Sequence, residues 1–87
     1  MEHPAFDDFV VLLMHVGELP SGEAVAALPR EPRGNLRFGR AIDYVMKMPS
    51  GERWRYDIRG NPHYVSTDEI IEIAETIEYQ AWTAKNV

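Results

Sequence analysis

The 87-residue sequence contains no cysteine, which excludes disulfide bonds, thiolate chemistry and cysteine-ligated zinc. A small secreted domain that depends on disulfides is excluded with them. Long apolar runs are absent as well, since the longest covers residues 9–14, far fewer than the roughly 20 residues that span a membrane. Glu2, Asp7 and Asp8 stand where a signal peptide would carry positive charge. We therefore expect a soluble protein of the cytoplasm with no membrane partner.

The chain is also too short for a large core. We expect a single domain over residues 1–87, and a domain of this size buries only about 60% of the surface that its unfolded chain exposes. Its composition, 45% hydrophobic and 26% charged, is that of a folded globular domain. A deep catalytic cavity is hard to build in such a domain, so its size disfavours an enzyme.

Basic residues are missing from the first third of the chain, which gives the net charge of −5 a strong internal pattern. Residues 1–29 carry five acidic groups and no Lys or Arg, for a charge of −5. Residues 30–59 carry eight basic against four acidic groups, for +4, and residues 60–87 carry five acidic groups and one Lys, for −4. This layout predicts either a basic central surface or internal charge pairing that neutralises it.

The beginning of the chain predicts an N-terminal helix. Pro4 suits a first helical turn, Asp7 suits the positive end of the helix dipole, and Gly17 is a stop signal. These features predict a helix over residues 4–16. A strand over residues 9–16 is the alternative, because the Val-Val-Leu-Leu run suits either period.

The next segment predicts a short helix and a linker. Ser21 can cap a helix over residues 22–28, which Pro29 ends. Residues 29–35 contain two prolines and one glycine, so they leave no regular hydrogen-bond ladder. We therefore expect a linker there.

Residues 36–48 fit both a helix and a strand. In a helix, capped by Asn35, the apolar side chains share one face. In a strand, residues 49–52 would form a hairpin turn, but Ala41 and Val45 would have no evident packing role. We prefer the helix, whose other face carries side chains spaced by three, four and three: Arg37, Arg40, Tyr44 and Lys47.

Residues 53–58 alternate strictly and predict a strand. Trp54, Tyr56 and Ile58 lie on one face, and charged side chains lie on the other. Residues 59–62 predict a turn, after which residues 63–65 return as a partner strand. The chain therefore predicts a β-hairpin at about residues 53–65.

The last part of the chain predicts a helix over residues 67–82. Ser66 and Glu69 form a capping box, and apolar residues follow at helical spacing, ending with Ala81 and Ala84. One face of this helix is either solvated or a binding surface for a basic partner; its members are Asp68, Glu72, Glu75 and Tyr79.

The sequence offers little for catalysis, metals or cofactors. His3, His15 and His63 form no His-x-x-x-His pair and have no acidic residue at a ligand spacing. The serines occupy cap or turn positions, and no segment matches a nucleotide-binding loop or a nucleophile elbow. We therefore assign no catalytic residue, no metal site and no cofactor. A pocket that joins His15 or His63 to a carboxylate would reopen the enzymatic interpretation.

The predicted order of helix, short helix, basic helix, hairpin and closing helix resembles winged-helix domains over residues 5–65. The resemblance implies DNA binding, with the basic helix in the major groove and the hairpin on the backbone. Two departures are the acidic net charge and a linker longer than a helix-turn-helix turn. The residues of this basic face are Arg37, Arg40, Tyr44 and Lys47 on the helix and Arg53, Arg55 and Arg59 on the hairpin.

Together these features predict an α+β domain that binds another macromolecule. Nine aromatic residues, with Met14, Met46 and Met48, exceed what one small core needs, and exposed aromatics, Met and Arg are typical of protein interfaces. We expect a small protein-binding regulator or inhibitor, of the adaptor, immunity or phage type. DNA binding is the alternative, and a homodimer would also account for the complementary charges.

Overall fold

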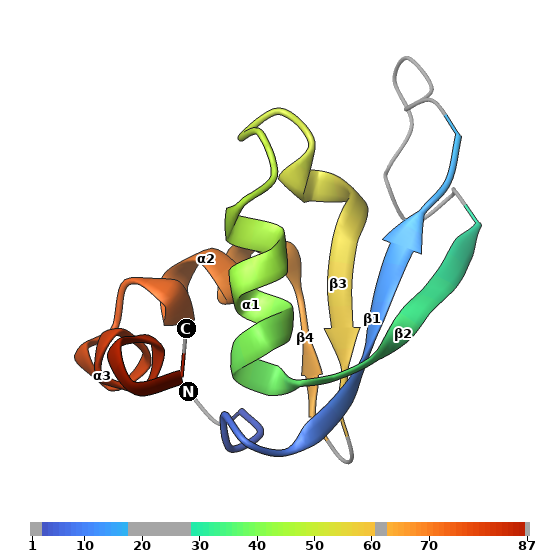
Figure 1. Cartoon of the computed structure of the whole chain (residues 1–87). Coiled ribbons are helices and arrows are strands. Elements are labelled where there is room, and N and C mark those ends of the chain that lie inside the picture. The colour runs from blue at the N-terminus through green and yellow to red at the C-terminus, as the bar shows by residue number, and fades with distance from the viewer. Residues whose placement is uncertain (1–2, 18–28, 61–62, 87) are drawn as a thin grey trace.

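A single antiparallel sheet organises the structure (Figure 1), a computed structural model that describes residues 3–17, 29–60 and 63–86. The sheet has the strand order β2-β1-β3-β4, and each neighbouring pair is antiparallel. An antiparallel sheet combined with helices confirms the α+β class. The strands are β1 (Phe9–His15), β2 (Arg30–Arg37), β3 (Tyr56–Arg59) and β4 (Tyr64–Val65).

Three helices in the described part of the chain lie together on one side of this sheet (Figure 1). A short 3-10 turn, η2 (Arg53–Arg55), precedes β3. The core lies between the sheet and the helices, and Phe38, Ile58 and Ile70 are among its fully buried members. No helix of the described residues is long and apolar enough to cross a membrane. The helices are α1 (Phe38–Met46), α2 (Thr67–Ala74) and α3 (Ile77–Asn86).

The predicted N-terminal helix is wrong, and the alternative is right: residues 9–15 form β1. This strand pairs with β2 along one edge and with β3 along the other. Val10 and Leu12 point into the core, whereas Leu13 is buried outside the core cluster. A central strand that is covered on both faces needs a continuous apolar run, which also resembles a buried helix.

The predicted linker at residues 29–35 is also wrong, because most of it lies in β2. β2 is an edge strand, so Pro32 can lack an amide hydrogen without breaking the sheet. The pairing register shifts opposite Leu12 and Leu13, and nearby Gly34 has a φ of 134°, in the region that favours glycine. The predicted helix over residues 22–28 lies outside the described residues.

The preferred helix over residues 36–48 is confirmed as α1, with slightly shorter bounds. Its expected apolar face is buried, and Phe38, Ala41, Ile42 and Val45 belong to the core. Asn35 does not cap it, because β2 continues to Arg37 and the helix begins directly after the strand.

The predicted hairpin is confirmed in part. Residues 53–55 form η2 instead of a strand, and β3 begins at Tyr56. Residues 64–65 return as β4, with Ile58 opposite Val65. The strand is shorter than the alternation predicts because the arginines on either side of Trp54 make internal hydrogen bonds that hold the turn, as described below.

The predicted helix over residues 67–82 begins as expected but is broken. The capping box is present, with the Ser66 hydroxyl accepting a hydrogen bond from the Glu69 amide at 3.4 Å. The helix stops at Ala74, where the Thr76 hydroxyl donates to the Ile73 carbonyl at 2.7 Å and accepts from the Tyr79 amide at 3.2 Å. This hydroxyl ends α2 and caps α3, so Ile77 is 83% exposed instead of joining the core face.

The last helix is held against α1 through Trp82, which is partly buried against the core. A Cβ placed on Gly39 of α1 would lie 2.5 Å from the Trp82 ring, so the close approach of the two helices requires glycine there. The indole Nε1 donates to Asp7 at 3.2 Å. Trp82 therefore fixes α3 to α1 and does not lie outside the core.

Candidate functional site

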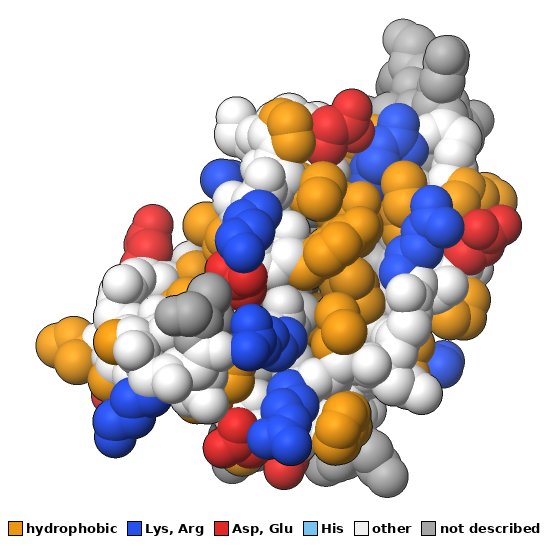
Figure 2. Space-filling view, viewed as in Figure 1, with side chains coloured by type: hydrophobic (Ala, Val, Ile, Leu, Met, Phe, Trp, Pro, Cys, Tyr) orange, Lys and Arg blue, Asp and Glu red, His pale blue; other side chains and the backbone are white. Residues whose placement is uncertain are grey.

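The exposed side of α1 carries four predicted binding residues, which we call the α1 row: Arg37, Arg40, Tyr44 and Lys47. All four are exposed, and Tyr44 retains 40% of its accessible surface. In Figure 2 the cations form a line along this helix. The buried side of α1 fixes the helix in the core, so the α1 row has a defined orientation. The structure therefore brings these four predicted residues together.

Two cations of the α1 row have acidic neighbours. Arg37 lies 3.4 Å from Asp7, and Lys47 lies 2.9 Å from Asp43. Within residues 3–17, 29–60 and 63–86, Arg40 has no ion-pair partner. Exposed ion pairs contribute only about 0–1 kcal/mol, so another acidic group can replace these partners readily.

An apolar band lies beside the α1 row, between α1 and strands β1 and β2 (Figure 2). Its members are partly exposed around the edge of the core: Met14 and Leu36. The Tyr44 ring packs edge-on against Tyr56, with 5.6 Å between centroids, and so joins the α1 row to this band. Cations thus flank an apolar surface on one face of the molecule.

The remaining predicted basic residues do not join the α1 row. Arg53 donates to the Met46 carbonyl at 2.8 Å, and Arg55 donates to the Gly17 carbonyl at 2.5 Å. Both side chains are half-buried, so their hydrogen bonds serve the fold. Arg59 is exposed, but it alternates with buried Ile58 and points to the face of the sheet opposite the helices.

The predicted acidic helix face is also divided. Asp68, Glu72 and Glu75 are exposed at α2, whereas Tyr79 of α3 is only 6% exposed. Burial, with a smaller contribution from Asp43, raises the pKa of the Tyr79 phenol to about 12. The break between α2 and α3 turns this ring into the core, so three of the four predicted residues remain available to a partner.

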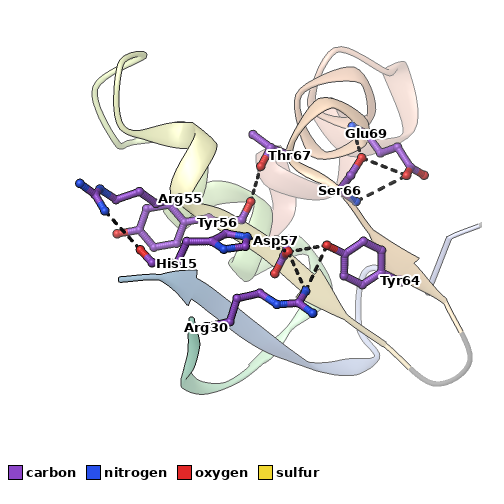
Figure 3. Close-up of polar contacts among 9 residues, drawn as sticks. All are labelled: His15, Arg30, Arg55, Tyr56, Asp57, Tyr64, Ser66, Thr67 and Glu69. Atoms are coloured by element: carbon purple, nitrogen blue, oxygen red, sulfur yellow. Dashed lines mark hydrogen bonds and ion pairs between the residues drawn. The ribbon is translucent and has the colours of Figure 1, made fainter. Parts of the chain in front are cut away.

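A second polar group, which sequence reasoning did not identify, lies on the other face of the sheet. Each of the four strands contributes one side chain to it (Figure 3). Asp57, only 3% exposed, accepts hydrogen bonds at Oδ2 from the Tyr64 hydroxyl and from Arg30 Nη1, the latter at 3.1 Å. His15 Nε2 lies 3.5 Å from the same oxygen. We call these four residues, His15, Arg30, Asp57 and Tyr64, the Asp57 cluster.

The Asp57 cluster raises the pKa of its tyrosine, Tyr64. Burial of the hydroxyl, then the hydrogen bond to the Asp57 carboxylate, raises the pKa of Tyr64 to about 12. The neutral phenol donates to the carboxylate, whereas a phenolate would repel it, so deprotonation is disfavoured.

A pocket of about 650 Å³ opens beside the Asp57 cluster. The cluster lines one side, and Arg53, Trp54 and the first turn of α2 line the other. This volume lies within the range typical of small-molecule sites, roughly 300–1,000 Å³.

The pocket meets the condition for reconsidering catalysis, since it joins His15 to a carboxylate. Nucleophilic catalysis also needs a nucleophile hydrogen bonded to the base. Among the described residues no hydroxyl donates to His15, and no group of three or more metal-binding side chains occurs.

The sequence contained a weak signal for this cluster. Asp57 stands between Tyr56 and Ile58 in an alternating segment, which places it on the opposite face of β3. Its contact with His15 could be predicted only if residues 9–15 were recognised as a strand. Its contact with Arg30 likewise required residues 30–37 to be recognised as a strand. The two errors in the first half of the chain therefore hid the site.

Comparison of the chain with protein-family models, with curated proteins and with solved structures found no match.

Proposed function

We propose that this chain is a non-enzymatic interaction protein whose α1 row and apolar band bind an acidic surface of another protein. The observation that carries the proposal is the exposure of the α1 row on a helix whose opposite side is fixed in the core. Such a protein would act as a regulator or inhibitor of its partner. The acidic residues of α2, Asp68, Glu72 and Glu75, are a secondary surface for basic groups.

The physical properties of this face suit a protein interface. Interface cores are enriched in aromatic residues, Met and Arg, with charge at the rim. The apolar band supplies Met14 and Leu36, Tyr44 of the α1 row lies beside it, and Arg33 Nη2 lies 3.1 Å from the Met14 sulfur. An acidic partner can therefore bury apolar surface while its carboxylates contact cations on both sides.

Charge complementarity indicates an acidic partner. The α1 row contributes three cations, whereas the first and last thirds of the chain carry charges of −5 and −4. An acidic protein is attracted to this row and repelled elsewhere, which orients the encounter and suppresses other binding modes.

DNA binding is the alternative, and the helical state of residues 38–46 is the observation that favours it. Of the winged-helix order over residues 5–65, the described residues contain α1 and the β3–β4 hairpin, but strand β1 stands where the first helix was expected. The hairpin arginines Arg53 and Arg55 donate to the protein's own carbonyl groups. This alternative predicts DNA affinity that falls steeply with salt and weakens in Arg37→Ala and Arg40→Ala variants.

Affinity capture from the native host, with wild-type protein and two charge-reversal variants, tests the proposal. Arg40→Glu combined with Lys47→Glu reverses the charge of the α1 row from +3 to −1, and Lys85→Glu of α3 is the control elsewhere on the surface. We expect an acidic protein that the wild type and the control retain and the α1 variant loses. Recovery of nucleic acid alone, or equal capture by all three proteins, would contradict the proposal; self-association in sedimentation would identify a second copy as the partner.

A further inference from the structure

We propose that the pocket beside the Asp57 cluster is a separate ligand site, which binds a planar uncharged heterocycle of the nucleobase type. The site lies away from the α1 row and does not depend on it. A nucleobase, alone or as part of a nucleoside or nucleotide, presents a flat apolar face and an edge of hydrogen-bond donors and acceptors. The lining of the pocket matches both features.

Flat groups line the pocket from two sides. Trp54, which is half-buried, is one of them. Tyr64 is exposed over half of its surface, and the Arg30 guanidinium lies 5.8 Å from its ring centre. Bases stack on aromatic rings and also on guanidinium planes, and each stacked base contributes about 1–3 kcal/mol. The pocket thus offers surfaces for a ring.

The charges of the described residues that line the pocket balance. Arg30 and Arg53 are the cations, and Asp57 and Asp68 are the anions. Arg30 uses Nη1 for the Asp57 cluster, and Arg53 uses Nε and Nη2 for backbone carbonyls, so each guanidinium keeps further donors. A lining with no net charge gives no advantage to a simple anion or cation. It favours an uncharged ligand that both accepts and donates hydrogen bonds.

The base of the pocket retains hydrogen-bonding capacity that the fold does not use. His15 and Asp57 are 6% and 3% exposed, and within the described part of the chain His15 Nδ1 and Asp57 Oδ1 have no hydrogen-bond partner. An unpaired buried polar atom destabilises a structure by about 1–3 kcal/mol. Both residues line the pocket, so the edge of a heterocycle bound there is positioned to supply a missing bond.

Titration of the protein with nucleosides, followed by the indole N–H signals in ¹H–¹⁵N NMR spectra, tests this site. The chain has two tryptophans, and a Trp82→Phe variant leaves only the Trp54 signal, which identifies it. We expect guanosine or another nucleoside to shift the Trp54 signal at millimolar concentration, and ribose to leave it in place. A parallel titration with a single-stranded pentanucleotide shows whether the base comes from a free nucleoside or from a strand.

Two sets of variants connect binding to the lining. Arg30→Gln with Asp57→Asn removes both charges together, avoids an unpaired buried charge, and should weaken nucleoside binding by about tenfold. The exposed Asp68→Asn leaves the core untouched and should shift preference from the nucleoside toward its monophosphate. An unmoved Trp54 signal, an equal response to ribose, or unchanged binding in both variants would overturn the proposal.

Discussion

The α1 row and the Asp57 cluster both place charged side chains on regular structure, but they differ in what surrounds the charge. In the α1 row the Arg37 and Lys47 side chains are 53% and 68% exposed, and their ion pairs are replaceable. In the cluster the Asp57 side chain is 4% exposed and depends on its neighbours from the other three strands. The exposed charges are therefore free for function, whereas the buried ones also determine stability.

Removing the carboxylate at the centre of the Asp57 cluster should have the largest effect on stability. In Asp57→Ala the buried His15 and the more exposed Arg30 and Tyr64 lose their acceptor. We expect a loss of about 3 kcal/mol in the free energy of unfolding, the lower end for a buried ion pair, because Arg30 is solvated. Urea denaturation at neutral pH measures it. The paired variant, Arg30→Gln with Asp57→Asn, should be less destabilised because it keeps polar groups of similar shape. A loss below about 1 kcal/mol in Asp57→Ala would show that the carboxylate does not matter to the fold.

Adding a methyl group at Gly39, on the buried side of α1, should have the next largest effect on stability. Gly39→Ala places its Cβ 2.5 Å from the Trp82 ring, and overpacking of this kind destabilises a core by about 1–3 kcal/mol. Gly51→Ala is the matched control, because nothing lies within 4 Å of its Cβ. Thermal and urea unfolding of both variants measure the difference. Equal stability of the two would contradict the close packing of α3 on α1.

Alkaline pH should destabilise the fold through two tyrosines, Tyr64 of the Asp57 cluster and Tyr79 of the core. The folded-state pKa values of Tyr64 and Tyr79 are raised from the ordinary 10 to about 12, so the stability that each neutral phenol contributes is complete below pH 10 and lost as pH rises through 12. Urea denaturation across this range should show the decline. Tyr64→Phe should make the fall of the free energy of unfolding with pH less steep. An unchanged fall would show that the pKa of Tyr64 is the same in the folded and unfolded protein.

Reversing the charge of the α1 row should have the smallest effect on stability. Arg40 and Lys47 are exposed, so Arg40→Glu with Lys47→Glu should change the free energy of unfolding by less than about 0.5 kcal/mol. Urea denaturation checks this beside the Asp57 variants. A loss of several kcal/mol would mean that these cations serve the fold, and the contrast between the two regions would disappear.

Local patterns predicted the second half of the fold well. The amphipathic spacing of α1, the capping box at Ser66 and the return strand at residues 64–65 each depend on neighbouring residues, which the sequence shows directly. The α1 row could be predicted for the same reason. The break before α3 was missed because the Thr76 side chain competes locally with the helical hydrogen bonds.

The first half depended on long-range pairing, which local patterns do not reveal. β1 is stabilised by two neighbouring strands, and β2 tolerates Pro32 only because it lies at the sheet edge. The Asp57 cluster joins residues up to 49 positions apart, from His15 to Tyr64, and no local spacing encodes it. A site formed across strands becomes visible only when the order of those strands is known.

The affinity of the captured partner for three proteins tests the central claim most directly. Isothermal titration calorimetry would compare the wild type, the α1 variant Arg40→Glu with Lys47→Glu, and the pocket variant Arg30→Gln with Asp57→Asn. We predict that the α1 variant binds at least about tenfold more weakly, a difference of about 1.4 kcal/mol, and that the pocket variant binds like the wild type. Unchanged affinity in the α1 variant, with loss in the pocket variant, would contradict the assignment of partner binding to α1.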